Sequence, residues 1–190
     1  MTKFGIGQGV PRWEDPRLLR GGGRYSDDLN RQGQVYGHVL RSPHANAKIL
    51  SMDTSTAAGM PGVMGVWTGE DYAASGLGNI PCAVPRQKAD GSPMFLPPNG
   101  ALRKDAVKMV GDPVCWVVAE TPKQAQDAAE AIFVDYEEIP SVTGTGHALD
   151  KGGATVWDEA PDNVCFVFEM GDKEKTDAAF ENAHHVTSLD

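Results

Sequence analysis

A helix with a complete start signal, placed between two apolar stretches, constrains the fold of this chain more than any other feature. The stretch Val114–Ala119 is almost continuously apolar, as is typical of a strand covered on both faces. Thr121 then offers a capping hydroxyl, Pro122 suits the first helical position, and Gln124 completes a capping-box pattern. A second apolar stretch near 132–136 follows the helix. This part of the chain therefore predicts a strand, a capped helix and another strand.

The same order recurs in two weaker segments, 48–67 and 164–189, and a further strand is predicted near 34–41. These units are shorter than the repeat of a doubly wound nucleotide fold, which favours a less regular class. We therefore predict an α+β fold. It should hold a mixed sheet made of short strand–helix–strand units and one capped helix near 121–131.

Two segments lack a strand or helix period. Residues 1–34 are rich in glycine and proline and predict an irregular arm. Residues 76–104 contain five prolines and form a connection of a length that is uncommon inside a compact domain. This Pro-rich loop is a packed arm, a partner-binding loop or a disordered segment, and the sequence leaves the three alternatives open.

Charge and hydropathy limit the partners and the location. The net charge of −9 repels nucleic acid, and no basic stripe offsets it. The longest apolar run is Val114–Ala119, far short of a membrane span. The first residues lack the pattern of a signal peptide. We therefore expect no nucleic-acid partner and no membrane span, and a cytoplasmic location.

The usual signatures of catalysis or cofactor binding are weak. The glycine string that starts at Gly5 lacks the preceding strand and following helix that a phosphate loop needs. Neighbours such as His184 and His185 point to opposite faces of a strand and cannot chelate one metal ion. None of the three cysteines sits in a C-x-x-C pair. Cys115 should be buried and inert, whereas Cys82 should be more exposed.

Acidic pairs occur at 14–15, 27–28, 70–71 and 137–138, all near predicted turns or element ends. Solvated edges are the plain interpretation of these pairs. The alternative is a hydrolytic pair facing one cleft, which would make this chain a small independent enzyme. Cys82 in a cleft is a second form of that alternative.

The string from Arg41 to Ala45 is the most unusual short motif. Arg41 and His44 flank a turn fixed by Pro43 and offer charge-assisted hydrogen bonds across an interface. The alternative is that both side chains stabilise the end of a strand locally. Arg41 and His44 are the candidate interface residues predicted from the sequence.

Taken in order, several motifs resemble the opening of the large subunit of the xanthine dehydrogenase and aldehyde oxidase family, in its carbon monoxide dehydrogenase-like branch. The resemblance covers about the whole chain. The segments that carry it are Glu14–Leu19, Gly23–Asp28, Leu40–Ala45 with Ile49, Asp53–Val63, Val66–Thr68, Val110–Val114, Val117–Thr121, Ala125–Ala129, Val134–Glu137, Ile139–Pro140, Asn163 and Gly171–Asp172.

That resemblance implies three parts. Residues 1–20 would be an irregular N-terminal arm, residues 21–137 the α/β hammerhead domain of the family, and residues 138–190 a linker with the truncated start of the molybdopterin-binding domain. In the family the large subunit holds molybdenum on molybdopterin and passes electrons to iron–sulfur and flavin subunits.

The family's active-site loops come later than position 190. The resemblance therefore implies no catalytic, cofactor-binding or metal-binding residue in this chain, and molybdopterin-bound molybdenum only in the full-length subunit. The expected role is structural: the chain would support the remaining molybdopterin-binding domains and the partner subunits of a hydroxylating oxidoreductase. The alternative is a free-standing binding or scaffold module without redox chemistry.

Overall fold

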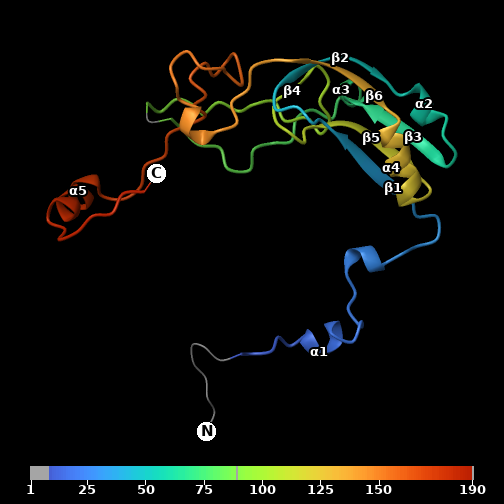
Figure 1. Cartoon of the computed structure of the whole chain (residues 1–190), viewed down its shortest axis with the longest axis horizontal. Coiled ribbons are helices and arrows are strands. Elements are labelled where there is room, and N and C mark those ends of the chain that lie inside the picture. The colour runs from blue at the N-terminus through green and yellow to red at the C-terminus, as the bar shows by residue number, and fades with distance from the viewer. Residues whose placement is uncertain (1–8, 89, 190) are drawn as a thin grey trace, which may run out of the picture.

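The structure is a computed structural model that describes residues 9–88 and 90–189. Six strands and five α-helices form along this part of the chain, with two single 3-10 turns (Figure 1). The strands are β1 (Tyr36–Arg41), β2 (Ala47–Asp53), β3 (Val63–Thr68), β4 (Ala106–Val107), β5 (Pro113–Ala119) and β6 (Phe133–Glu138). The helices and turns are α1 (Asp15–Leu18), η1 (Ser26–Asp28), α2 (Ser55–Ala58), α3 (Gly69–Ala74), α4 (Pro122–Glu130), η2 (Thr145–His147) and α5 (Lys173–Glu181).

The strands form two antiparallel sheets of three strands each, in the orders β1-β5-β3 and β4-β2-β6. Consecutive strands always belong to different sheets, so the chain alternates between the sheets at every step from β1 to β6. The α+β class is confirmed, but the predicted mixed sheet is wrong. Because α2 and α4 each lead from one sheet to the other, no strand–helix–strand unit places two parallel strands side by side.

Helix α4 forms as its sequence predicts. The Thr121 side chain accepts a hydrogen bond from the Gln124 backbone N–H at 3.2 Å, and Pro122 occupies the first turn. The Gln124 side chain does not complete a capping box. Its Oε1 instead accepts a hydrogen bond from the Thr121 hydroxyl at 2.8 Å. The buried face consists of Ala125, Ala128 and Ala129. These small side chains let the helix lie close against β1 and β5.

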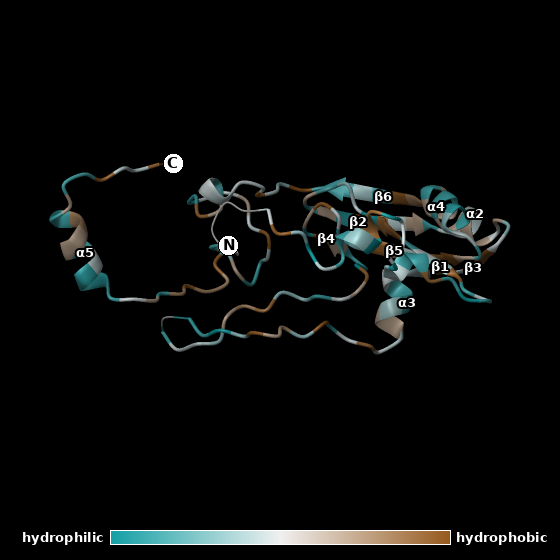
Figure 2. Ribbon diagram, turned by 90° about the horizontal axis from the view of Figure 1, so that it is seen from below, coloured by the Kyte–Doolittle hydropathy of each residue, from teal (hydrophilic) through white to brown (hydrophobic). Residues whose placement is uncertain are grey.

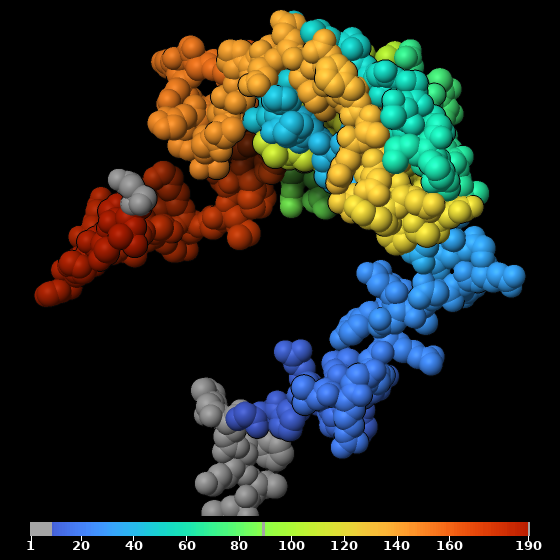
Figure 3. Space-filling model, turned by 45° about the vertical axis from the view of Figure 1, so that its right-hand side comes forward, coloured from blue at the N-terminus to red at the C-terminus, as the bar shows by residue number. Residues whose placement is uncertain are grey.

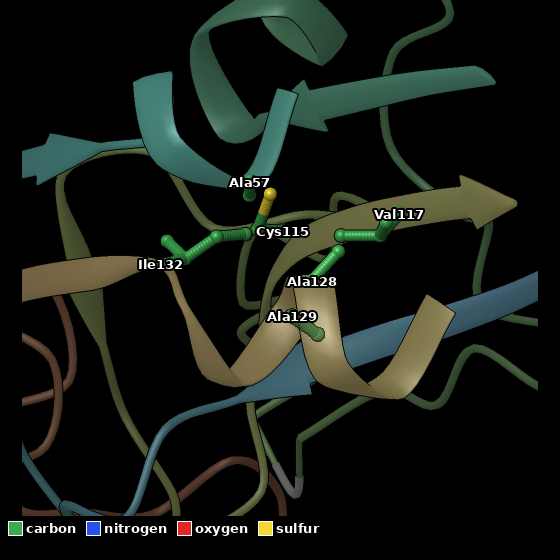
Figure 4. Close-up of a cluster of buried hydrophobic side chains, with 6 residues drawn as sticks. All are labelled: Ala57, Cys115, Val117, Ala128, Ala129 and Ile132. Atoms are coloured by element: carbon green, nitrogen blue, oxygen red, sulfur yellow. The ribbon is translucent and has the colours of Figure 1, made fainter. Parts of the chain in front are cut away.

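The core lies between the sheets and the helices. One cluster joins α2, β5 and the C-terminal end of α4 with the segment that follows it, through Ala57, Cys115, Val117, Ala128, Ala129 and Ile132 (Figure 4). A second cluster consists of Ala47, Val107 and Val114. Leu40 and Met52 pack against both clusters, so the two sheets share one continuous interior.

The C-terminal part is less regular than the sequence indicates. Helix α5 forms, with the Asp172 side chain accepting from the Lys175 backbone N–H at 3.0 Å. The strands predicted near 164–169 and 185–189 do not form within the described residues. A strand needs a partner, and the one backbone bond recorded for the first segment joins the Phe95 N–H to the Cys165 carbonyl at 3.2 Å.

Two irregular segments leave the body. The N-terminal arm, described from residue 9, extends away from the sheets before β1 (Figures 1 and 3). The Pro-rich loop leaves after α3 and returns to β4 (Figure 2). Its two limbs bond to each other, as between the Ile80 N–H and the Asn99 carbonyl at 2.8 Å and across the Gln87–Pro93 bridge. The loop therefore has defined structure.

Candidate interface at the turn between β1 and β2

The turn after β1 holds the predicted residues Arg41 and His44, whose side chains contact different partners. The Arg41 guanidinium donates from Nη1 to the Gly111 carbonyl at 2.8 Å. Buried Ser42 fixes the turn from both sides: its N–H donates to the Asp112 carbonyl at 2.9 Å, and its carbonyl accepts from the Gly111 N–H at 2.8 Å. The Ser42 hydroxyl accepts the His44 backbone N–H at 3.0 Å. The β1–β2 turn is thus joined to the turn before β5.

His44 contacts β6. Its Nδ1 lies 3.3 Å from Oε1 of Glu138, and its ring centroid lies 4.8 Å from that of Tyr136 in a tilted arrangement. Burial raises the pKa of the Tyr136 hydroxyl. These contacts support the alternative of local stabilisation. The interface role of the two residues stays a prediction. Arg41 is exposed and uses one of its five N–H donors for Gly111, so the other donors could serve a partner.

A buried carboxylate beneath this turn was missed by the sequence reasoning. Asp112 has no exposed surface and accepts from Nε of Arg103 at 2.9 Å, from the Lys108 N–H at 2.7 Å and from the Met109 N–H at 3.2 Å. Arg103 also donates from Nη1 to the Pro98 carbonyl at 2.9 Å. Asp112 thus ties the end of the Pro-rich loop to the β1–β2 turn. Its place between Gly111 and Pro113 predicts a turn but gives no sign of a buried ion pair.

One carboxylate from each of three predicted acidic pairs binds the backbone, whereas Glu137 lies 3.1 Å from Nζ of Lys48 and Glu138 3.3 Å from Nδ1 of His44. Asp15, Asp28 and Asp71 each accept a bond from the backbone N–H three residues earlier, at 2.8 Å in each case. Thr68 and Asp71 form a capping box at the start of α3, and these bonds lower the pKa of Asp71. The interpretation of these carboxylates as element ends therefore agrees with the structure.

The described part of the chain gives no sign of a metal site. In the part of the chain that the structure describes, no three His, Cys, Asp or Glu side chains are placed to hold a metal ion. Gly5 to Gln8 of the glycine string lie outside the described residues. Cys82 is exposed and Cys115 is fully buried, as expected. Burial raises the pKa of the Cys115 thiol from its ordinary value of 9.0 to about 11.

The two thiols should differ strongly in reactivity. With a thiol reagent at neutral pH, we expect exposed Cys82 to react faster than buried Cys115. We expect Cys115 itself to react at least about 100-fold more slowly in the native chain than in denaturant, because raising its pKa by two units reduces its thiolate fraction by about that factor. Mass spectrometry of the labelled native chain measures both rates. In denaturant all three cysteines should react alike. Equal rates for Cys82 and Cys115 in the native chain would contradict this account.

The raised pKa of Cys115 also determines how its contribution to the stability of the fold changes with pH. Because the thiol ionises more easily in the unfolded chain, its contribution to stability is complete below about pH 9. The contribution is lost as the pH rises toward 11.

Within residues 9–88 and 90–189, none of the helices combines the length and the apolar character that a bilayer crossing requires.

Comparison with known proteins places this geometry in a family. A family model described as the a/b hammerhead domain of aldehyde oxidase and xanthine dehydrogenase matches residues 20–140. The large subunit of nicotine 6-hydroxylase from Paenarthrobacter nicotinovorans is 39% identical over 99% of this chain and 22% of its own length.

Solved structures agree with this match. Quinoline 2-oxidoreductase from Pseudomonas putida 86 superposes with a TM-score of 0.71 and 39% identity, over 84% of this chain and 20% of that one. The Cu,Mo carbon monoxide dehydrogenase superposes with a TM-score of 0.68 and 31% identity, over 95% and 23%. The chain spans about a fifth of the length of these relatives. The chain therefore belongs to the aldehyde oxidase and xanthine dehydrogenase family and contains its α/β hammerhead domain.

Proposed function

We propose that this chain is the N-terminal structural domain of the large subunit of a molybdenum-dependent hydroxylating oxidoreductase. It supports the catalytic domains and the partner subunits, and it holds no complete active site of its own. The hammerhead domain would span residues 21–137, and residues 138–190 would be a linker with the start of the molybdopterin-binding domain. The implied partners are the remaining molybdopterin-binding domains and the iron–sulfur and flavin subunits, in the cytoplasm.

The exposed apolar side chains of the two ends of the chain carry this proposal. In the N-terminal arm, Trp13 is 98% exposed and Leu19 is 86% exposed. Near the other end, Met170 is 89% exposed, and Phe166 and Phe168 also face solvent. Apolar surface of this extent normally marks an interaction site. A supporting domain that packs against further domains accounts for these side chains, whereas an isolated module leaves them in water.

The described residues supply no donor set for a metal ion, so no catalytic step through molybdenum is derived for this chain. In a complete subunit such a group would supply the redox chemistry. This chain would position the catalytic domains and contact the partner subunits.

The proposal is tested by co-expression of this chain with a separate polypeptide that carries the rest of the large subunit. We expect the two to co-purify, with molybdenum in the complex and less than stoichiometric molybdenum or iron in the chain alone, measured by plasma mass spectrometry. Substituting Trp13 and Leu19 by serine should weaken association at least about tenfold, because each buried large apolar side chain contributes about 1.5–3 kcal/mol.

The matched control is Met64→Ser, which changes a side chain on the body that is 63% exposed and should leave association unchanged. Arg41→Ala and His44→Ala test the predicted interface, and we expect both to weaken association while the chain stays folded. Stoichiometric molybdenum on the chain alone would contradict the claim that the site lies elsewhere. Failure to associate would favour the free-standing scaffold module.

A further inference from the structure

A hollow beside α3 is lined by more cationic than anionic side chains, although the chain as a whole is acidic. The cavity has a volume of about 500 Å³ and lies between α3, the end of the Pro-rich loop and Trp157. Among the described residues that line it, the cations Arg103, Lys104 and Lys108 face a single carboxylate, Asp105. The chain as a whole carries −9. A cleft lined mainly by one sign of charge concentrates ligands of the opposite sign, so this cavity favours an anion.

The three cations differ in what they can offer. Arg103 is committed, since Nε binds buried Asp112 and Nη1 binds the Pro98 carbonyl. Lys108 donates one N–H of its ammonium to Oδ1 of Asn46 at 3.3 Å, which leaves two donors. Lys104 is 47% exposed, and its Nζ lies 4.0 Å from the Glu70 carboxylate, at the outer limit of an ion pair. Arg103 is therefore a structural part of the cavity lining. Lys104 and Lys108 have N–H donors left for a ligand.

Two aromatic side chains form part of the lining, Tyr72 from α3 and Trp157 from the C-terminal part. The Tyr72 hydroxyl donates to the Gly78 carbonyl, which fixes the ring. The Trp157 ring lies 6.1 Å from the Phe95 ring and 5.4 Å from Nζ of Lys108. Aromatic faces beside a cation are suited to a flat ligand with an anionic group at one end.

A glycine at the start of α3 makes this arrangement possible. A Cβ atom at Gly69 would lie 2.1 Å from the Arg103 carbonyl oxygen. Only glycine therefore allows the backbone of residues 103–104 to pass so close to α3. That approach sets Lys104 in the cavity lining together with Tyr72.

We propose that this cavity binds a small planar aromatic anion. Its ring would contact Tyr72 and Trp157, and its carboxylate or phosphate group would pair with Lys104 and Lys108. The volume lies within the range of small-molecule sites, roughly 300–1,000 Å³. All residues proposed for the site belong to this chain. Failure of the binding test would therefore leave the proposed structural role unaffected, and failure of that role would leave the binding site unaffected.

The test is a titration of the chain with three probes that share one ring system: 2-naphthoate, 2-naphthyl phosphate and the neutral 2-naphthamide. Binding is followed in ¹H–¹⁵N correlation spectra, in which the four tryptophans give separate indole signals. We expect the Trp157 indole to shift with either anion, and the amide to bind at least about tenfold more weakly, since a charged hydrogen bond is lost. Added salt should weaken the anions only. The better of the two anions identifies the anionic group.

Substitutions locate the site. Lys104→Met and Lys108→Met should each weaken the anions about tenfold and leave the amide unchanged. The control is Lys48→Met, because Lys48 pairs with Glu137 outside the cavity. The described residues give the Lys104 side chain no hydrogen bond and only a 4.0 Å approach to Glu70, so its variant remains informative if Lys108→Met fails to fold. Equal binding of the amide and the anions, binding of inorganic phosphate as strong as that of naphthyl phosphate, or unchanged affinity in Lys104→Met would overturn the proposal.

Discussion

Replacing Asp112 by alanine is expected to lower the free energy of unfolding by about 3–5 kcal/mol, the range for breaking a buried ion pair from one side. Asp112 is fully buried, and the side chain of its partner Arg103 is 16% exposed. The substitution leaves the guanidinium without its carboxylate and removes the acceptor of the Lys108 and Met109 N–H groups. Urea unfolding followed by circular dichroism measures the loss.

An exposed ion pair provides the matched control. Asp177 pairs with Lys173 on α5, where the two side chains are 55% and 84% exposed. Asp177→Ala should cost less than about 1 kcal/mol, because exposed pairs contribute little in water. A loss below about 1 kcal/mol for Asp112→Ala as well would show that the buried carboxylate does not hold the Pro-rich loop to the body.

Ala128→Leu is expected to destabilise the chain by about 1–3 kcal/mol through overpacking. Ala128 has no exposed surface and lies in the cluster formed with Cys115 and Val117 (Figure 4). A larger side chain at this position forces α4 away from the sheet, which costs more than the added apolar burial returns. Thermal unfolding of the two proteins measures the difference.

Gln126→Leu introduces the same side chain on the exposed face of α4 and should change stability by less than about 0.5 kcal/mol. Comparable destabilisation by the two leucines would mean that helix propensity, and not packing against β1 and β5, determines the effect. Stabilisation by Ala128→Leu would show that the helix lies further from the sheet than the structure indicates.

The elements that the sequence predicts well are those with a complete local signal. The Thr121 cap and the apolar run before it act within one stretch of chain, and both occur in the structure. Thr68 caps α3 through the same kind of local side-chain bond. The family resemblance is confirmed by the match over residues 20–140.

The features that the sequence does not predict depend on distant partners. The pairing of β1 and β3 with β5 joins segments far apart in the chain, and no local pattern specifies it. Asp112 looks like an ordinary turn residue until Arg103 is seen beside it. The segment near 164–169 is a nearly continuous apolar run typical of a strand, but it has no neighbouring strand among the described residues.

The alternation of the strands between the two sheets has a consequence for how the domain folds. No two strands that follow each other in the sequence are hydrogen-bonded, so neither sheet can form as an autonomous hairpin early in folding. Loop-closure entropy must be overcome for every pairing, which makes folding slow and places the rate-limiting barrier late. The region from β1 to β6 should accordingly unfold as one cooperative unit. A ribosome-bound chain should stay unstructured there until β5 and β6 have left the exit tunnel.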